Sequence, residues 1–348
     1  MAERATAFAP GRVNLIGEHT DYNEGLALPF AIGDGVTVRA TRTRGDRVHV
    51  IAADLGAQDD FSLSAPGPAK GWRAFVRGAV AELTAAGCDL AAAHLEIAGS
   101  VPRGSGLSSS AALEVALCLA LLAVSGADEP GRLALAQICS RVENDWVGAR
   151  TGLLDQLASL CGETDCALSV DFQSLDVTPV PLELDGYSLI TLDSGQRHSN
   201  ADDGSAAPAG YNRRRAECAR ACELLEIDSL RQATLEMARG LPEPLASRAR
   251  HVLTENERVR ATVAALSHGN MERVGELLNE SHASLRDCYE VSTPAVKRTV
   301  ARLRDAGAVG ARIMGGGFGG HILGLIPHAA RAPEDAIVVT PSAGARIL

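Results

Sequence analysis

Side chains able to bind a polar ligand are crowded into a short stretch near the start of the sequence, APGRVNLIGEHTDYNEG at residues 9–25. This stretch holds Arg12, Asn14, Glu18, His19, Asp21, Tyr22 and Asn23. Carboxylates next to a histidine and amides can bind sugar hydroxyls through directed, charge-assisted hydrogen bonds. The apolar residues Leu26 to Ile32 follow and predict a strand beside this loop. Composition alone favours a more ordinary interpretation, a solvated loop with a helix N-cap at Thr20 or Asp21.

A second candidate is the glycine- and serine-rich sequence VPRGSGLSSSAA at residues 101–112. A predicted strand, His94 to Ala98, precedes it, and a helix rich in alanine and leucine, Ala111 to Val124, follows it. Glycines let the backbone approach phosphates closely, serine hydroxyls add donors, and a helix N-terminus favours negative charge. The Gly-Lys-Ser/Thr of a Walker loop is absent. An anion-binding loop and a flexible linker are therefore about equally good interpretations.

Two further segments are ambiguous by themselves. MGGGFGG at residues 314–320 lies between predicted strands at 311–314 and 322–326. Its five glycines cost chain entropy, so something must require bare backbone there. A tight turn or a β-bulge would explain them as well as a ligand would. GLLDQL at residues 152–157 places Asp155 in apolar surroundings, where a carboxylate is either catalytic or a structural cap. Taken alone, the cap is the better interpretation.

These segments are distributed over a mixture of strands and helices. Strands are expected within residues 26–40, 48–55, 167–172 and 188–192, and helices at 72–83, 132–147, 211–226, 245–266, 271–285 and 294–306. The order shows no regular strand–helix alternation, so it predicts an α+β fold rather than a doubly wound sheet. Proline, glycine and aspartate are dense in residues 175–210, which places a domain seam there. We therefore divide the chain into domains 1–180 and 181–348.

Composition and charge exclude several classes of function. The chain has 348 residues, of which 46% are hydrophobic and 22% charged, as in an ordinary folded protein. Its net charge of −10 argues against nucleic acid as the main partner, because such a partner requires a basic face. The longest apolar run, Val115 to Val124, is too short to span a bilayer. The eight cysteines form no CxxC pair and predict reduced thiols in a cytoplasmic protein, and no obligate protein partner is indicated.

Taken together, the segments resemble the galactokinase branch of the GHMP small-molecule kinases. GRVNLIGEHTDYNEG at residues 11–25 is similar to the galactokinase signature nearly letter for letter. GLSSSAA at 106–112 resembles the family's phosphate loop, MGGGFGG resembles its third motif, and GLLDQLASL at 152–160 resembles the segment that carries its catalytic aspartate. YNRRRAEC at 211–218 and NESHASLRD at 279–287 are similar to further family stretches. The glycine-rich motifs point to a GHMP kinase, and EHTDYN points to the galactokinase branch.

The resemblance implies the two-domain GHMP kinase fold, with the active site in the cleft between the domains. It makes Arg12 the stabiliser of the transition state and Asp155 the acceptor of the sugar proton, unless Asp155 mainly orients the hydroxyl. The residues that would hold the sugar are Glu18, His19, Thr20, Asp21 and Tyr211. The residues that would wrap the ATP phosphates are Gly104, Ser105, Gly106, Leu107, Ser108, Ser109 and Ser110, and Ser110 with Glu143 would ligate Mg²⁺. The family usually has a shorter stretch before the sugar-contacting tyrosine; here ADDGSAAPAG at 201–210 predicts a mobile surface loop.

The reaction implied by the resemblance is transfer of the γ-phosphate of ATP to the anomeric C1 hydroxyl of D-galactose, as the first committed step of galactose catabolism. ATP and Mg²⁺ are the implied cofactors, and galactose and ATP are the implied small-molecule partners. One alternative is a kinase for a related sugar such as N-acetylgalactosamine, arabinose or galacturonate. Another is a non-catalytic galactose and ATP sensor. Regulatory relatives have lost residues just after the GLSSS stretch, whereas Ser110, Ala111 and Ala112 are present here, so the enzyme is favoured.

Overall fold

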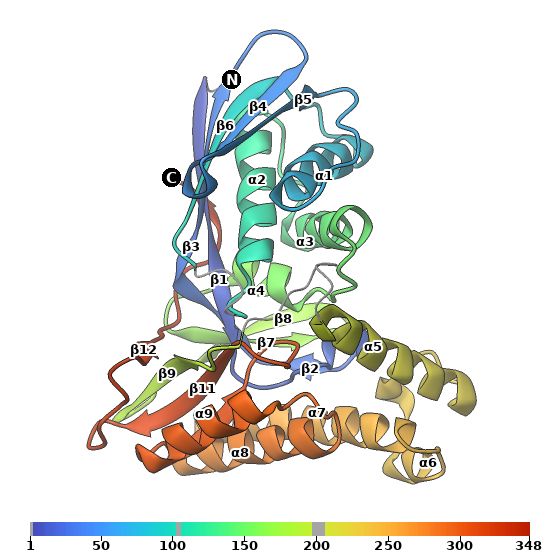
Figure 1. The fold of residues 1–348 in the computed structure, drawn as a ribbon, viewed down its shortest axis with the longest axis vertical. Helices are drawn as coiled ribbons and strands as arrows, with labels where there is room; N and C mark the ends of the chain where they lie inside the picture. Colours follow the sequence, from blue (N-terminus) through green and yellow to red (C-terminus); the bar gives the residue numbers. More distant parts are fainter. Residues whose placement is uncertain (1–2, 102–105, 197–205) are drawn as a thin grey trace.

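The computed structural model describes residues 3–101, 106–196 and 206–348, with the backbone alone for 206–209. A six-stranded sheet with helices on one face forms the upper lobe in Figure 1. Its strands, in spatial order, are β13 (Arg346–Ile347), β1 (Arg4–Asn14), β3 (Pro29–Arg42), β6 (Ala93–Gly99), β4 (Arg47–Ala52) and β5 (Ala57–Ser62). The helices are α1 (Trp72–Ala85), α2 (Ser109–Ser125), α3 (Arg132–Arg141) and α4 (Leu154–Cys161). The central helix α2 is apolar on nearly all sides and is buried accordingly.

Two smaller sheets and a layer of helices make up the rest of the described chain (Figure 1). One sheet contains β2 (Leu26–Ala27), β7 (Cys166–Asp171) and β8 (Asp176–Pro181). The other contains β10 (Gly310–Ile313), β11 (His321–Pro327), β9 (Tyr187–Asp193) and β12 (Ile337–Val338). The helices of the lower lobe are α5 (Ala206–Leu225), α6 (Leu235–Arg239), α7 (Leu245–Ser267), α8 (Met271–Asp287) and α9 (Pro294–Asp305). The expected α+β class is confirmed, because helices and largely antiparallel strands are mixed without regular alternation.

Three local differences from the expected elements bear on function. The stretch around Arg12 is strand β1 and not a loop. The expected helix 132–147 is α3 followed by a π-helical turn, Val142–Val147, which carries Glu143. Within ADDGSAAPAG, residues 206–210 are the first turn of α5, so they are not the surface loop we expected. Residues 201–205 of that stretch lie outside the described part of the chain.

Both halves of the chain contribute to the same hydrophobic packing. One buried cluster joins Val13 on β1 and Leu28, between β2 and β3, to Leu278 on α8 and Leu323 on β11. The C-terminal strand β13 pairs with β1 in the upper sheet, with Ala7 opposite Ile347. The division into 1–180 and 181–348 stays a prediction, and the end of the chain returns to the first lobe. None of the helices in the described ranges is both long enough and apolar enough to cross a membrane.

Candidate active site

Two cavities meet at the N-terminal end of α2. The larger has a volume of about 1050 Å³ and lies against the sheet and helices of the upper lobe. The smaller, of about 240 Å³, lies where β1, α4, α5 and the glycine-rich segment after β10 come together. Ser109, Ser110 and Ala149 line both cavities. A molecule in one cavity can therefore reach a molecule in the other across the first turn of α2.

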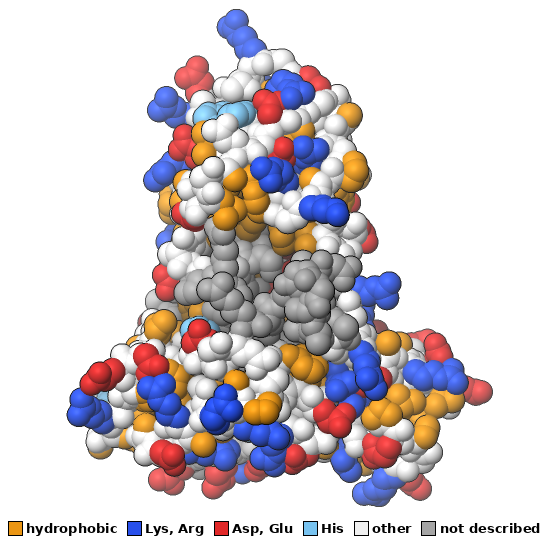
Figure 2. Space-filling model, viewed as in Figure 1, with side chains coloured by type: hydrophobic (Ala, Val, Ile, Leu, Met, Phe, Trp, Pro, Cys, Tyr) orange, Lys and Arg blue, Asp and Glu red, His pale blue; other side chains and the backbone are white. Residues whose placement is uncertain are grey.

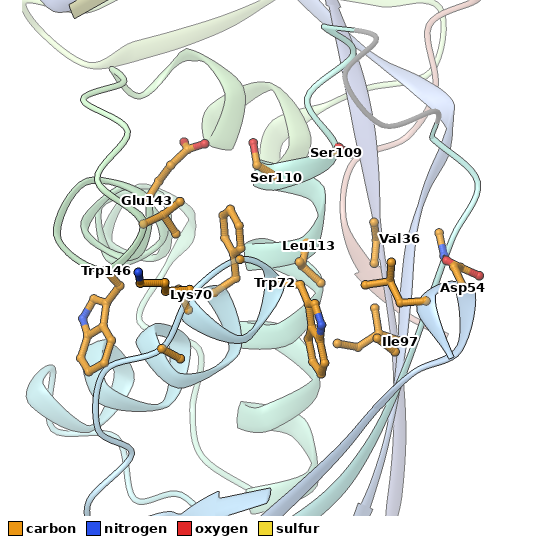
Figure 3. Close-up of a pocket in the computed structure, with 18 of the residues that line it drawn as sticks. Val36, Asp54, Lys70, Trp72, Ile97, Ser109, Ser110, Leu113, Glu143 and Trp146 are labelled. Atoms are coloured by element: carbon orange, nitrogen blue, oxygen red, sulfur yellow. The ribbon is translucent and has the colours of Figure 1, made fainter. Parts of the chain in front are cut away.

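The larger cavity has aromatic and aliphatic walls and a polar end. Trp72 and Phe75 on α1 face it, Trp146 reaches it from the π-helical turn, and Ile97 lines the sheet side. Figure 3 shows the Ser110 hydroxyl and the Glu143 carboxylate together at one end, away from the two indole rings. Lys70 and Asp54 also line the cavity, away from this end (Figure 3), and the remaining walls are largely apolar. Such a slot suits a planar base whose charged tail extends toward the helix N-terminus.

Most of the predicted sugar, catalytic and phosphate-loop residues line the smaller cavity together. They are Arg12, Glu18, His19, Asp21, Gly106, Ser108, Ser109, Ser110, Asp155 and Tyr211. Residues 9–25 reach it by two routes, because Arg12 extends from β1 whereas Glu18, His19 and Asp21 lie in the turn that follows. His19 has a positive φ of 61°, a backbone conformation that side-chain-bearing residues adopt infrequently. A strained turn that presents three polar side chains to a cavity is typical of a functional site.

Arg12 and Asp155 form the central ion pair of the smaller cavity. Arg12 Nε lies 2.9 Å and Nη2 lies 2.8 Å from Asp155 Oδ1. The Ser108 hydroxyl donates to Asp155 Oδ2, and Arg12 Nη1 donates to the Gly106 carbonyl. The backbone N–H of Arg12 also donates to the Leu107 carbonyl at 3.0 Å. One cluster thus fixes β1, the segment Gly106 to Ser108 and Asp155 relative to one another.

Burial shifts the protonation of the groups around this pair. Burial and the neighbouring charge of Asp155 raise the pKa of Asp21 to about 7. Burial also raises the pKa of Glu18, although Arg312 and Arg12 oppose that shift. Burial lowers the pKa of His19 to about 3, so this imidazole is neutral at physiological pH. Its Nδ1 is hydrogen-bonded to the Tyr22 hydroxyl at 2.8 Å.

Ser110 and Glu143 present oxygen atoms suited to a hard cation. Glu143 is 2% exposed, and its Oε2 accepts hydrogen bonds from Thr151 at 2.8 Å and Gln156 at 3.0 Å. Burial and the nearby Asp155 raise the pKa of Glu143, and its hydrogen bond to Ser110 opposes that shift. Within the described ranges, no three or more His, Cys, Asp or Glu side chains cluster in a way that could hold a metal ion. This donor set fits Mg²⁺, which commonly takes one or two protein ligands and completes its shell with phosphate and water oxygens.

Other predicted site residues lie elsewhere. Thr20 is fully buried and is not among the described residues that line the smaller cavity. Its hydroxyl donates to the carbonyls of Gly17 and Leu26 at 2.9 and 2.8 Å. The Leu107 side chain is buried, and this residue contributes its carbonyl. Gly104 and Ser105 lie outside the described residues.

Two glycines of MGGGFGG are explained by contacts with the site, whereas Gly317 and Gly319 are explained by close approaches to Val291 and Gln196. A Cβ on Gly316 would lie 2.8 Å from Cδ2 of Tyr211, so the bare backbone makes room for that ring. Gly315, with a φ of 68°, donates its N–H to Glu18 Oε1 at 2.8 Å. The third motif therefore shapes the smaller cavity and does not merely form a turn.

Sequence reasoning missed several lining residues. In the smaller cavity these are Ala149, Arg150, Thr151, Gly152, Leu154, Asn212, Gly315 and Gly316. In the larger cavity, Trp72 and Phe75 belong to residues 72–83, for which the sequence predicts only a helix. Trp72 and Trp146 are the two tryptophans of the chain. Tryptophan is rare in this chain, and large aromatic rings often line ligand sites, so the two tryptophans were the one feature of the sequence that could have indicated this cavity.

Comparisons with known proteins agree with this geometry. The galactokinase galactose-binding signature matches residues 2–42, the GHMP kinase N-terminal domain matches 74–163, and the GHMP kinase C-terminal domain matches 262–336. A galactokinase of Streptomyces coelicolor is 39% identical over 98% of this chain and 93% of its own length. A galactokinase of Roseiflexus sp. is 42% identical over 91% of this chain and 82% of its own.

Solved structures give the same picture. The crystal structure of Lactococcus lactis galactokinase complexed with galactose superposes with a TM-score of 0.91 at 32% identity, over 99% of this chain and 95% of that one. The Methanococcus jannaschii mevalonate kinase matches with a TM-score of 0.67 at 15% identity, over 96% and 97% of the two chains. The second likeness shows the shared GHMP kinase fold.

Proposed function

The chain belongs to the galactokinases of the GHMP kinase family, and from this premise we propose how its two cavities carry out the reaction. ATP occupies the larger cavity and D-galactose the smaller one, and the γ-phosphate passes to the C1 hydroxyl of the sugar, giving galactose 1-phosphate and ADP. The observation that carries this proposal is the position of the Arg12–Asp155 pair, which lines the smaller cavity and is bonded to Ser108, next in sequence to the serines that line both cavities. A pair of opposite charges at that junction can act on the attacking hydroxyl and on the phosphate at once.

The turn after β1 and the ring of Tyr211 select the sugar. Glu18 and Asp21 supply carboxylate acceptors, His19 supplies a neutral imidazole, and Tyr211 closes the side of the cavity against Gly316. Each buried polar group needs a hydroxyl partner of matching position, because an unpaired buried donor or acceptor costs about 1–3 kcal/mol. An epimer that misplaces one hydroxyl leaves such a group unpaired. The site should therefore reject glucose, which differs from galactose at one carbon.

Asp155 and Arg12 act on the step itself. Asp155 accepts the proton of the attacking hydroxyl and orients that hydroxyl toward the phosphate. Arg12, already fixed by Asp155 and the Gly106 carbonyl, places positive charge where negative charge develops on the transferring group. The backbone N–H groups at the start of α2 and the hydroxyls of Ser108 to Ser110 bind the phosphates.

Mg²⁺, held by Ser110 and Glu143, would supply further positive charge at the phosphates. Glu143 is preset for this role, since its Oε2 is already fixed by Thr151 and Gln156. The buried carboxylate has an acidic neighbour, Asp155, so a cation beside it relieves repulsion.

We also propose that the enzyme works in the cytoplasm and takes small molecules as its partners. All eight cysteines are free thiols in the structure, which suits a reducing compartment. Lys, Arg, Asp and Glu side chains are interspersed over the lower lobe in Figure 2, a distribution that suits solubility better than the continuous basic face of a nucleic-acid binder.

A coupled assay of ADP release across a sugar panel tests the proposal. The panel contains galactose, glucose, N-acetylgalactosamine, arabinose and galacturonate. Asp155→Asn is the control, because this variant should not catalyse phosphate transfer. We expect galactose to be turned over far better than glucose and ADP release to depend on the sugar. Equal turnover of glucose and galactose would overturn the assignment of the sugar. ADP release that Asp155→Asn does not reduce would overturn the assignment of the site.

A further inference from the structure

A buried arginine of the lower lobe reaches the sugar-binding turn. Arg312 lies on β10, close in sequence to the third glycine motif, and its side chain is fully buried. Its Nη1 donates to the carbonyls of Asn14 and Leu15, at 3.0 and 2.9 Å. Its Nη2 lies 3.4 Å from Glu18 Oε1. One guanidinium therefore holds the end of β1 and faces the carboxylate that comes a few residues later.

These contacts determine where the Glu18 carboxylate points. Glu18 Oε1 receives the Gly315 N–H at 2.8 Å and the charge of Arg312 on the same side. Glu18 is 4% exposed, and Arg312 is the first of the neighbouring cations that oppose the effect of burial on the Glu18 pKa. A buried carboxylate without such a partner would be displaced or would take up a proton. Arg312 itself is not among the described residues that line the smaller cavity, so it acts through Glu18 and not on the sugar.

Helix α7 holds the same turn in a different way. Glu255 accepts the Gly17 N–H at 3.1 Å and is paired with Arg258 at 2.7 Å. His251 Nε2 donates to the Glu18 carbonyl at 3.0 Å. These groups contact the backbone of the turn and do not contact the Glu18 carboxylate. The difference supplies a matched control, because Arg258 supports the turn through Glu255, whereas Arg312 contacts both the backbone and the carboxylate.

We propose that Arg312 is a positioning residue for sugar recognition: it aims the Glu18 carboxylate into the smaller cavity, and so sets the affinity for the one sugar hydroxyl that Glu18 binds. This inference rests on the proposed function, since it requires that Glu18 contacts the sugar. It assigns a determinant of specificity to a residue that lies 297 positions after Leu15, which is part of the galactose-binding signature.

Steady-state kinetics of Arg312→Met and Arg312→Lys, compared with Glu18→Gln and Arg258→Met, test the proposal on the full chain. Arg312→Met should raise the galactose KM about ten- to a hundredfold, the range expected if the misplaced Glu18 carboxylate loses its hydrogen bond to the sugar. The KM for ATP should change by no more than a few-fold. Arg312→Lys keeps the charge but cannot donate to two carbonyls and face a carboxylate together, so it should rescue only part of the loss.

Monodeoxy galactoses separate positioning from general support of the turn. The deoxy sugar that abolishes the penalty of Glu18→Gln should also abolish the penalty of Arg312→Met, because both variants act on the same hydroxyl. For Arg258→Met the penalty should be similar for every sugar. The Glu18→Gln/Arg312→Met double variant should have a galactose KM close to that of Glu18→Gln alone. It also removes the unpaired buried carboxylate, so it provides a folded comparison if Arg312→Met alone is unstable.

Two results would overturn the inference. One is a penalty for Arg312→Met that is the same for every deoxy sugar. The other is a double variant whose loss is the product of the two single losses. A wild-type enzyme that does not turn over galactose would instead refute the proposed function, whatever the Arg312 variants do.

Discussion

Replacing Asp21 by asparagine should stabilise the ligand-free protein while weakening its hold on galactose. The Asp21 carboxyl is partly buried near Asp155 and Glu18, and the desolvation and these two charges raise its pKa from 3.8 to about 7. A Cβ on Gly152 would lie 2.1 Å from Asp21 Oδ2, so there is no room for the side chain to turn away in that direction. Asparagine has nearly the same shape and carries no charge at any pH.

The sign of the pH dependence follows from the raised pKa. The folded protein keeps the Asp21 proton up to about pH 7, whereas the unfolded chain loses it near 3.8. Between these values the unfolded state binds fewer protons, so the free energy of unfolding falls as the pH rises. The contribution of the protonated Asp21 carboxyl to the free energy of unfolding is fully present below pH 3.8 and is lost as the pH rises through about 7.

The size of the effect follows from the same shift. A difference of about 3 pKa units corresponds to about 4 kcal/mol, taken as an upper limit. Between pH 5 and pH 8 the titration covers about two of these units. The stability advantage of Asp21→Asn over the wild type should therefore grow by about 2–3 kcal/mol across that interval.

Urea unfolding of both proteins at pH 5 and pH 8, without ligands, measures this difference. Asp34→Asn, which removes an exposed carboxylate of β3, is the control and should show no such growth. A stability difference between Asp21→Asn and the wild type that is the same at both pH values would refute the electrostatic reasoning. The galactose KM of Asp21→Asn should rise, since the Asp21 carboxylate lowers the stability of the folded protein but is used to bind galactose.

Three further predictions concern the reaction. Asp155→Asn should lower kcat by about 10²–10³ and change ATP affinity little, because the carboxylate acts mainly as charge moves in the transition state; near-wild-type kcat in a folded variant would exclude this role. Ser110→Ala and Glu143→Ala should each weaken Mn²⁺ binding to the enzyme–nucleotide complex, followed by electron paramagnetic resonance, and raise the Mg²⁺ needed for half-maximal rate; unchanged titrations in both variants would be the contrary result. Gly152→Ala should raise the galactose KM, because Oδ2 of Asp21 would lie 2.1 Å from the new Cβ and the carboxylate would be displaced. The KM for ATP should stay within a few-fold of wild type, and an unaltered galactose KM would show that the carboxylate can move freely.

Periodicity and composition predicted much of the scaffold. The apolar spacing of residues 72–83 gave helix α1, and the alanine- and leucine-rich run from 111 gave α2. The failures occur where burial overrides local pattern. Arg12 and Asn14 lie in a buried strand, although proline, glycine and charge so close together are typical of a loop. Glu143 lies in a π-helical turn, which the helical period of residues 132–147 cannot distinguish from an ordinary helix.

The candidate site was predictable only through the family resemblance. Arg12 and Asp155 are 143 residues apart, and no local pattern indicates that their side chains meet. The motif matches supplied most of the residues that line the smaller cavity, but they could not place Thr20, whose hydroxyl is used within the turn. Arg312 carries no signal of its own in the sequence, because its role depends on a contact between the two ends of the chain.

Phosphorus–proton correlated NMR of the product formed from galactose and ATP tests the central claim most directly. The account predicts a single phosphorylated sugar in which phosphorus couples to the anomeric proton, with its formation lost in Asp155→Asn. Phosphorus coupled to the protons at C6, or a product that forms equally well in Asp155→Asn, would contradict the proposed site and its chemistry.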